Sequence, residues 1–169
     1  AGWWARWVGI GVFVILALGE SSAKTTIHSD DPRVVKMLTT VTETFRTKLQ
    51  TLFPEIEGGD LDLYAVENTP ALQALSERLH LSRPPSWAFG VCWSSRRVII
   101  IRLDGSFQMI RQTLLHEIVH LEFGKALSNA QAPLWFREGL AQLLERGLDV
   151  KKELSRSAVS VVMACLKDR

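Results

Sequence analysis

Cysteine and tyrosine are scarce in this chain of 169 residues, which contains two cysteines and one tyrosine. The cysteines, Cys92 and Cys165, stand far apart and in neither CxxC nor CxxxC spacing, so they do not make a cysteine-based zinc site. In an exported protein they could pair as a disulfide, and otherwise they would be two buried free thiols. The sequence leaves both alternatives open.

An excess of one charge is also missing, because the formal net charge is only +2 at pH 7. No run of arginine or lysine is flanked by aromatic residues that could stack on bases, so we expect no nucleic-acid partner. A hydrophobic fraction of 47% with 22% charged residues argues against intrinsic disorder. The length suits one compact domain, which we place at residues 24–169.

An uncharged apolar run lies near the start of the chain, from Trp7 to Gly19. Its length suits the apolar core of a signal peptide and falls short of the ~20 residues that span a bilayer comfortably. Ser21 and Ala23 supply the small residues that a cleavage site before Lys24 would need. A retained N-terminal membrane anchor is the close alternative. We therefore interpret residues 1–23 as an export or membrane signal, with the domain outside the cytoplasm.

The periodicity of apolar residues after Lys24 predicts short strands alternating with helices, and so an α+β fold. The tryptophans of this part, Trp87, Trp93 and Trp135, are expected in the core. Strands are expected over residues 25–29, 61–66, 87–93 and 97–103, the last of them inside the sheet. Helices are expected over 32–53, 69–83, 107–124, 133–147 and 150–166.

The most informative segment is FQMIRQTLLHEIVHLEFG, which predicts a helix from Phe107 to a C-capping Gly124. Its HEIVH motif places His116 and His120 on one face, where both imidazoles can bind one metal ion. A catalytic zinc takes three protein ligands and a water, and Glu117 could accept a proton from that water. Five-residue matches of this kind also occur in helices that bind nothing, where both histidines would be core residues.

A third protein ligand is expected on the next predicted helix. Glu138 stands 18 residues after His120, early in a helix that a polar loop lets fold back against the first. Glu122 should point away from His120, because two helical steps amount to about 200°. Glu145 should lie too far along the second helix to share the ion. Glu138 could also serve only to stabilise the start of its helix.

HEIVH followed by LWFREGLAQ resembles the gluzincin metallopeptidases, and most closely the peptidase MA-like group with its HExxH…EGLA signature. The resemblance covers roughly residues 27–147. It implies a zincin-like fold: a small twisted sheet, mostly antiparallel or mixed, packs on the HExxH helix, and a helical C-terminal part follows. A peptide or protein substrate would then lie as an extra strand along the edge strand, here 87–93.

The same resemblance implies Zn²⁺ bound by His116, His120 and Glu138. It implies peptide-bond hydrolysis through a metal-activated water, with Glu117 as the catalytic general base. This function implies peptide or protein substrates as partners, and the N-terminal segment adds a possible association with the membrane.

Two positions depart from the pattern of the gluzincins. Many of them stabilise the oxyanion with a tyrosine or histidine after the third ligand, whereas all four histidines and Tyr64 precede Glu138 here. Arg137 or a backbone N–H could serve instead. Some place an aspartate four residues after the ligand glutamate to orient a histidine, and Gln142 takes that place. A zinc-stabilised peptide- or protein-binding module without useful turnover, in a membrane-associated assembly or alone, is therefore the alternative function.

Overall fold

The computed structural model describes residues 23–54, 56, 58–146 and 164. The elements follow in the order β1 (Thr25–His28), α1 (Pro32–Leu52), β2 (Leu61–Val66), α2 (Thr69–Arg78), β3 (Gly90–Trp93), the 3₁₀ turn η1 (Ser94–Arg96), β4 (Val98–Arg102), α3 (Phe107–Asn129) and α4 (Leu134–Glu145). Within these residues the fold is α+β, as predicted, with one four-stranded sheet and four α-helices.

Two predicted segments fall outside this range: the N-terminal segment apart from Ala23, and the helix at 150–166 apart from Ala164. Among the residues that are described, no helix is both long enough and apolar enough to cross a membrane.

The sheet is mixed and has the strand order β1-β2-β4-β3. The pairs β1–β2 and β2–β4 are parallel, and β3 runs antiparallel to β4 with Cys92 opposite Ile99. The predictions that β4 lies inside the sheet and that the strand before it lies at an edge are both confirmed. The two parallel pairs arise because α1 and α2 are crossover connections.

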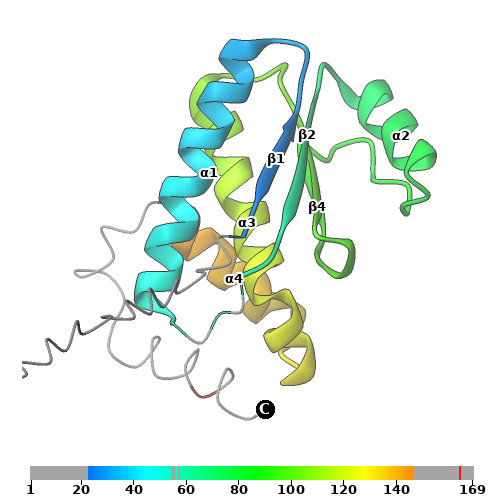
Figure 1. Ribbon diagram of the computed structural model, residues 1–169. Helices are drawn as coiled ribbons and strands as arrows, with labels where there is room; N and C mark the ends of the chain where they lie inside the picture. Colours follow the sequence, from blue (N-terminus) through cyan, green and yellow to red (C-terminus); the bar gives the residue numbers. More distant parts are fainter. Residues whose placement is uncertain (1–22, 55, 57, 147–163, 165–169) are drawn as a thin grey trace, which may run out of the picture.

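Helices cover both faces of the sheet (Figure 1). Ile99 and Ile101 of β4 face the large core that α1, α3 and α4 share, whereas Val98 and Ile100 face a smaller core with α2. An inner strand with both faces covered needs apolar side chains in both directions, which explains the continuous run in β4.

The start of α1 is as the sequence predicts. The side chain of Asp31 accepts the backbone N–H of Arg33 at 2.8 Å, and Pro32 occupies the first helical position. Helix α2 ends earlier than predicted, at Arg78, because His80 takes a left-handed backbone conformation with φ 54°. That residue closes the helix well before the prolines that were expected to end it.

The prediction that the HEIVH helix ends at Gly124 is wrong, because α3 continues to Asn129. Gly124 instead allows a close approach: a Cβ there would lie 2.9 Å from Cβ and Oγ of Ser94, in the turn between β3 and β4. The added turn buries Ala126 and Leu127 in the large core. The glycine therefore lets α3 pack against the sheet, and the loop to α4 is correspondingly short.

The tryptophan prediction is wrong for two residues of three. Trp87 and Trp135 are 82% and 74% exposed, whereas Trp93 is half-buried and donates its indole N–H to Ser82 Oγ at 2.9 Å. Trp87 precedes the edge strand, and Trp135 lies in the first turn of α4. Both positions are at the margins of the packed layers.

Candidate metal centre

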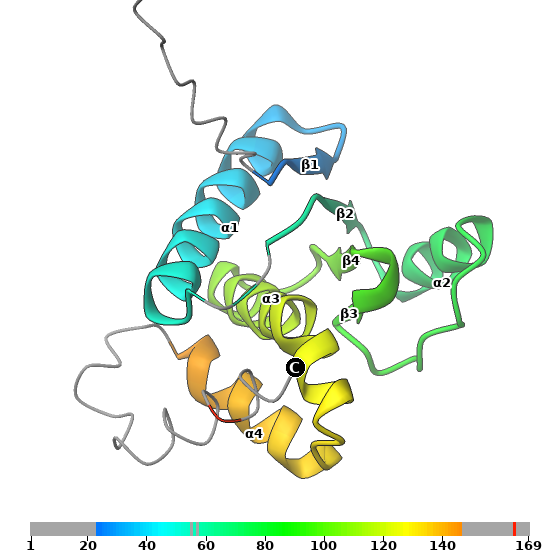
Figure 2. The same ribbon diagram turned by 60° about the horizontal axis from the view of Figure 1, so that its bottom comes forward.

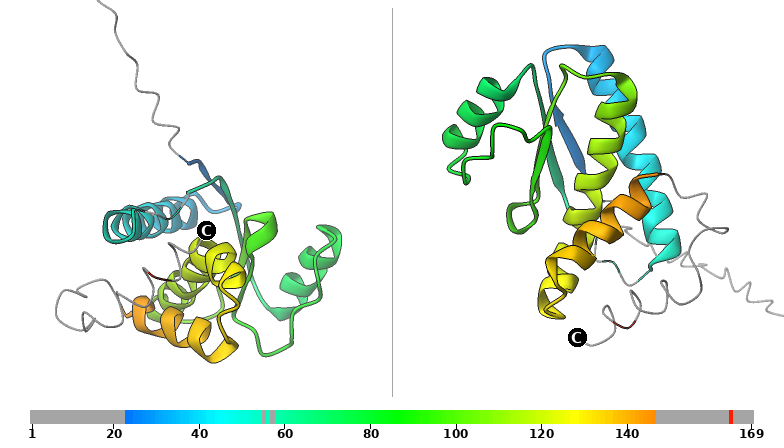
Figure 3. Two further views of the ribbon diagram at one scale, coloured as in Figure 1. Left: turned by 90° about the horizontal axis from the view of Figure 1, so that it is seen from below. Right: turned by 180° about the vertical axis from the view of Figure 1, so that it is seen from behind.

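Helices α3 and α4 bring His116, His120 and Glu138 together. Helix α4 turns back and lies across α3 (Figures 2 and 3), so that the first turns of α4 meet the middle of α3. Nε2 of His116 lies 3.0 Å from Nε2 of His120, and these atoms lie 3.3 and 3.4 Å from the Glu138 carboxylate. The three side chains form a half-buried group that could hold a metal ion.

The spacing of these atoms fits a small tetrahedral ion. With zinc–ligand distances of ~2.0–2.2 Å, the ligand atoms of a tetrahedron are separated by ~3.3–3.6 Å. The separations from His116 Nε2 to Glu138 Oε2, 3.3 Å, and from His120 Nε2 to Glu138 Oε1, 3.4 Å, fall in this range, and the two Nε2 atoms lie somewhat closer together, at 3.0 Å. The donor set of two imidazoles and one carboxylate also suits zinc.

Glu145 contacts the opposite side of the His116 ring. Its Oε2 lies 2.8 Å from Nδ1 of His116. If Nδ1 carries the proton and donates it to Glu145, then Nε2 of the neutral imidazole keeps a lone pair directed at the centre of the group. This arrangement favours metal binding at Nε2.

The residue that orients a histidine is thus Glu145 and not Gln142. Gln142 is exposed, and no hydrogen bond joins it to either histidine within the described residues. From the sequence, Glu145 is excluded as a metal ligand on distance, and its contact with Nδ1 of His116 is not predicted. Its position seven residues after Glu138, and so on the same side of the helix, was the available signal.

Glu117 lies where α3 meets the edge strand β3. A Cβ at Gly90 would lie 3.2 Å from Glu117 Cγ and 2.5 Å from Thr113 Cγ2, so only glycine allows this contact. Burial raises the pKa of Glu117 to about 7. The charge of His116 and a backbone hydrogen bond from Cys92 oppose this rise, while the charge of Glu138 adds to it. A carboxyl group with such a pKa can both accept and return a proton near neutral pH.

His120 is held toward its neutral form. Burial is the main cause that lowers the pKa of His120, and the charges of His116 and Arg137 lower it further, against the carboxylate of Glu138. A neutral imidazole is the form that binds a metal ion.

Arg137, the side chain proposed for oxyanion stabilisation, takes a defined position, and so does the only tyrosine of the chain, Tyr64. Arg137 is half-buried and donates through Nε to the carbonyl of Ala132 at 2.9 Å, beside the metal group. Tyr64 stacks on His28 with ring centroids 4.0 Å apart, and it packs with the smaller core under α2. Arg137 is therefore near the site, and Tyr64 belongs to another part of the fold.

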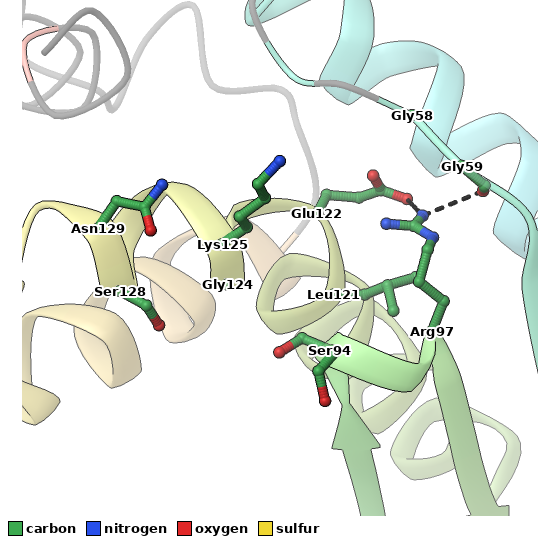
Figure 4. A pocket seen from close by; sticks show the side chains of 11 residues that line it. Gly58, Gly59, Ser94, Arg97, Leu121, Glu122, Gly124, Lys125, Ser128 and Asn129 are labelled. Carbon is green, nitrogen blue, oxygen red and sulfur yellow. Dashed lines mark hydrogen bonds and ion pairs between the residues drawn. The ribbon is translucent and has the colours of Figure 1, made fainter. Parts of the chain in front are cut away.

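Glu122 lies on the other side of α3, as predicted. Its Oε1 accepts from Arg46 at 2.8 Å and from Arg97 at 3.0 Å, and the Glu122 side chain is 2% exposed. Both arginines also donate to the carbonyl of Gly59. This network borders a surface hollow of about 530 Å³ that Figure 4 shows from close by. The hydrogen-bond network of Glu122, Arg46, Arg97 and Gly59 links α1 and α3 to the segment just before β2, and so has a structural role.

Cys92 carries a free thiol on β3. Burial and the nearby charge of Glu117 raise the pKa of this thiol, which is therefore a neutral core group near the site. Cys165 lies outside the described residues.

No protein-family model matches the chain, and no curated protein or solved structure matches it.

Proposed function

We propose that this protein is a zinc-dependent peptidase with a zincin-like fold. In this proposal His116, His120 and Glu138 hold the zinc ion, and Glu117 is the general base. The observation that supports it best is the convergence of the three ligand atoms, all within 4.8 Å of one another, next to a carboxyl group with a pKa of about 7.

Each residue has a separate task in this proposal. When bound, zinc supplies a Lewis acid for the scissile carbonyl and lowers the pKa of water toward ~7. Glu117 accepts the proton of the attacking water on its carboxylate and returns it to the leaving amine. Glu145 holds His116 in the tautomer that leaves Nε2 unprotonated.

The edge strand supports an extended peptide as the substrate. The N–H of Arg102 donates to the carbonyl of Phe89 at 2.9 Å. Because alternate residues of an antiparallel pair turn their backbone groups to the partner, Gly90 and Cys92 turn theirs to the open edge of the sheet. Both residues lie beside Glu117. A peptide paired along this edge would place its backbone next to the general base.

The first test is the metal content of the purified protein, counted per chain. We expect about one zinc ion per chain, lost in His116→Ala and weakened in Glu138→Ala. His28→Ala is the matched control, because His28 pairs with Asp62 at 2.8 Å and lies in another part of the sheet. Full metal content in all three variants would exclude this site.

The second test is turnover. Wild-type protein loaded with zinc should cleave unstructured peptides, and Glu117→Gln should retain the zinc but lose about 10²–10⁴-fold in rate, the usual contribution of a general base. Equal rates would remove Glu117 from the reaction.

A peptide-binding module that keeps the zinc but lacks turnover is the second candidate. It is favoured by the position of Tyr64, which stacks on His28 and not near the metal group. If wild type and Glu117→Gln bound peptides equally well and neither cleaved them, this second function would replace the first.

The place of action is part of the proposal. The apolar run from Trp7 to Gly19 supports export or anchoring at the membrane. We expect the full chain either to need detergent for solubility or to be cleaved near Lys24. The shorter protein, residues 24–169, should need no detergent. If the full chain were equally soluble without detergent and were not cleaved, the N-terminal segment would be neither an export signal nor a membrane anchor.

A further inference from the structure

Two large apolar side chains are exposed at the start of α4. Among the described residues, five large hydrophobic side chains are exposed: Trp87, Phe107, Met109, Leu134 and Trp135. Leu134 is 70% exposed and Trp135 is 74% exposed. Both stand in the helical turn just before the metal-binding candidate Glu138.

Leu134 belongs to the side of α4 that faces the histidines. Leu134, Glu138 and Glu145 follow one another at intervals of four and seven residues, which places them along one stripe of the helix. The two carboxylates of that stripe contact His116. Leu134 therefore continues the metal-facing stripe, ~6 Å along the axis from Glu138.

Trp135 lies beside the metal-facing stripe of α4, where its ring contacts that of Phe136. Its ring meets the ring of Phe136 edge to face, with centroids 5.9 Å apart, and Phe136 packs against the large core. The turn itself is fixed, because the N–H groups of Phe136 and Arg137 both donate to the carbonyl of Pro133, at 3.0 and 3.2 Å. The exposed pair is thus held on a defined helical turn.

We propose that Leu134 and Trp135 form an apolar lip of the active site that receives a large apolar side chain of the substrate, close to the cleaved bond. This inference rests on the proposed function and adds the substrate class: extended polypeptide segments rich in apolar residues. Folded proteins bury such segments, so the substrates are unfolded chains or unstructured peptides. The occupant follows from continuity with the metal-facing stripe: a peptide whose cleaved bond lies at the metal group comes within about one helical turn of Leu134.

Met109 is a further exposed apolar side chain, on the other helix that carries the metal group. It is 44% exposed and lies seven residues before His116, so the two share one side of α3. Phe107 is also exposed, at 57%, but it lies nine residues before His116 and so on the other side of the helix. Phe107 is therefore the matched control for removal of an exposed apolar side chain.

The test measures peptide binding in a Glu117→Gln background, so that no peptide is cleaved. Two peptides are compared that differ only in having leucine and phenylalanine, or serine and asparagine, around the central bond. We expect the first to bind at least about tenfold more tightly, the discrimination that small apolar contacts supply. Leu134→Ala with Trp135→Ala should abolish that preference and keep the zinc, and Phe107→Ala should leave both unchanged.

Several results would contradict the proposal that Leu134 and Trp135 bind an apolar side chain of the substrate. One is an apolar preference that survives in the double variant, and another is the absence of any apolar preference. A third is loss of binding to anionic lipid vesicles in the double variant with unchanged peptide affinity, which would make the pair a membrane contact. If the double variant loses the preference for the apolar peptide while the wild type cleaves no peptide, the lip binds peptides but the peptidase proposal is wrong.

Discussion

Glu145 Oε2 lies 2.8 Å from Nδ1 of His116, on the opposite side of the ring from the Nε2 atom that faces Glu138. One helix, α4, therefore holds His116 at both nitrogens, through two carboxylates seven residues apart. This contact fixes the rotation of the ring and favours the tautomer that binds metal at Nε2.

Glu145→Ala should weaken zinc binding about 10–100-fold, as the loss of such a hydrogen-bond partner typically does. Glu145→Gln should weaken it less, because an amide oxygen can still accept the proton of Nδ1. Competition with a chromophoric chelator measures both affinities. Gln142→Ala is the control on the same helix and should bind zinc as the wild type does. A stronger effect at Gln142 than at Glu145 would reverse the assignment.

The two histidines of the metal group could be predicted from the sequence because helix geometry alone relates them, whereas Glu138 was proposed from its place early on the next helix. His116 and His120 are four positions apart, and that spacing places them on one face of the helix. Glu145 was missed because its contact depends on how α4 crosses α3, and a spacing within one helix does not contain that angle. Gln142 is exposed and makes no hydrogen bond to either histidine within the described residues, whereas the charge of Arg137 acts on His120.

Predictions from short stretches of sequence were wrong where the packing of helices and strands against one another decides where a helix ends or whether a side chain is buried. Gly124 has the sequence features of a helix end, yet it lies inside α3. A glycine stands there because Ser94 of the neighbouring turn occupies the space that a Cβ would need. Trp135 was assigned to the core by its size, but its place at the margin of the layers leaves it exposed. The strand positions were predictable from β-rich runs, whereas the parallel pairing follows from crossovers that only the fold defines.

Glu122→Ala should destabilise the protein by about 3–5 kcal/mol, because it leaves Arg46 buried without its charged partner. The Arg46 side chain is only 6% exposed. Urea unfolding of the metal-free protein measures the change. Glu77→Ala removes an exposed pair with Arg83 and should cost at most about 1 kcal/mol. A cost of at most about 1 kcal/mol for Glu122→Ala as well would contradict the prediction, because it would mean that Arg46 tolerates the loss of its charged partner.

The metal-free protein should lose stability as the pH rises from about 4.5 to 7 through the titration of Glu117. The pKa of Glu117 is about 7 in the fold and ~4.3 in an unfolded chain. Between these values the folded state binds more protons than the unfolded state, so the free energy of unfolding falls with pH, by at most about 1.4 kcal/mol per pH unit from this group.

Unfolding by urea in the presence of a chelator, at several pH values, measures that slope. Glu117→Gln should remove this contribution and should therefore gain stability relative to wild type as the pH rises from about 4.5 to 7, with no further relative gain above about 7. Parallel profiles of the two proteins would mean that the carboxyl group titrates normally.

Gly90→Ala should disturb the contact between β3 and α3. A Cβ at this position would lie 2.5 Å from Thr113 Cγ2 and 3.2 Å from Glu117 Cγ, so the edge strand or the helix has to move. Crowding of this kind costs about 1–3 kcal/mol, and the shift should also displace Glu117 and reduce turnover more than zinc content. Thr113→Ser removes the methyl group in the way and leaves the hydroxyl.

The double variant Gly90→Ala with Thr113→Ser is therefore the decisive comparison. If the methyl group of Thr113 is the obstacle, this second substitution should restore most of the stability and turnover lost in Gly90→Ala. Thr113→Ser alone should have a small effect, because it only deletes a methyl group. Additive losses in the double variant would contradict the contact, since independent sites add and coupled neighbours do not. Recovery would show that the position of Glu117 depends on how closely the edge strand approaches α3.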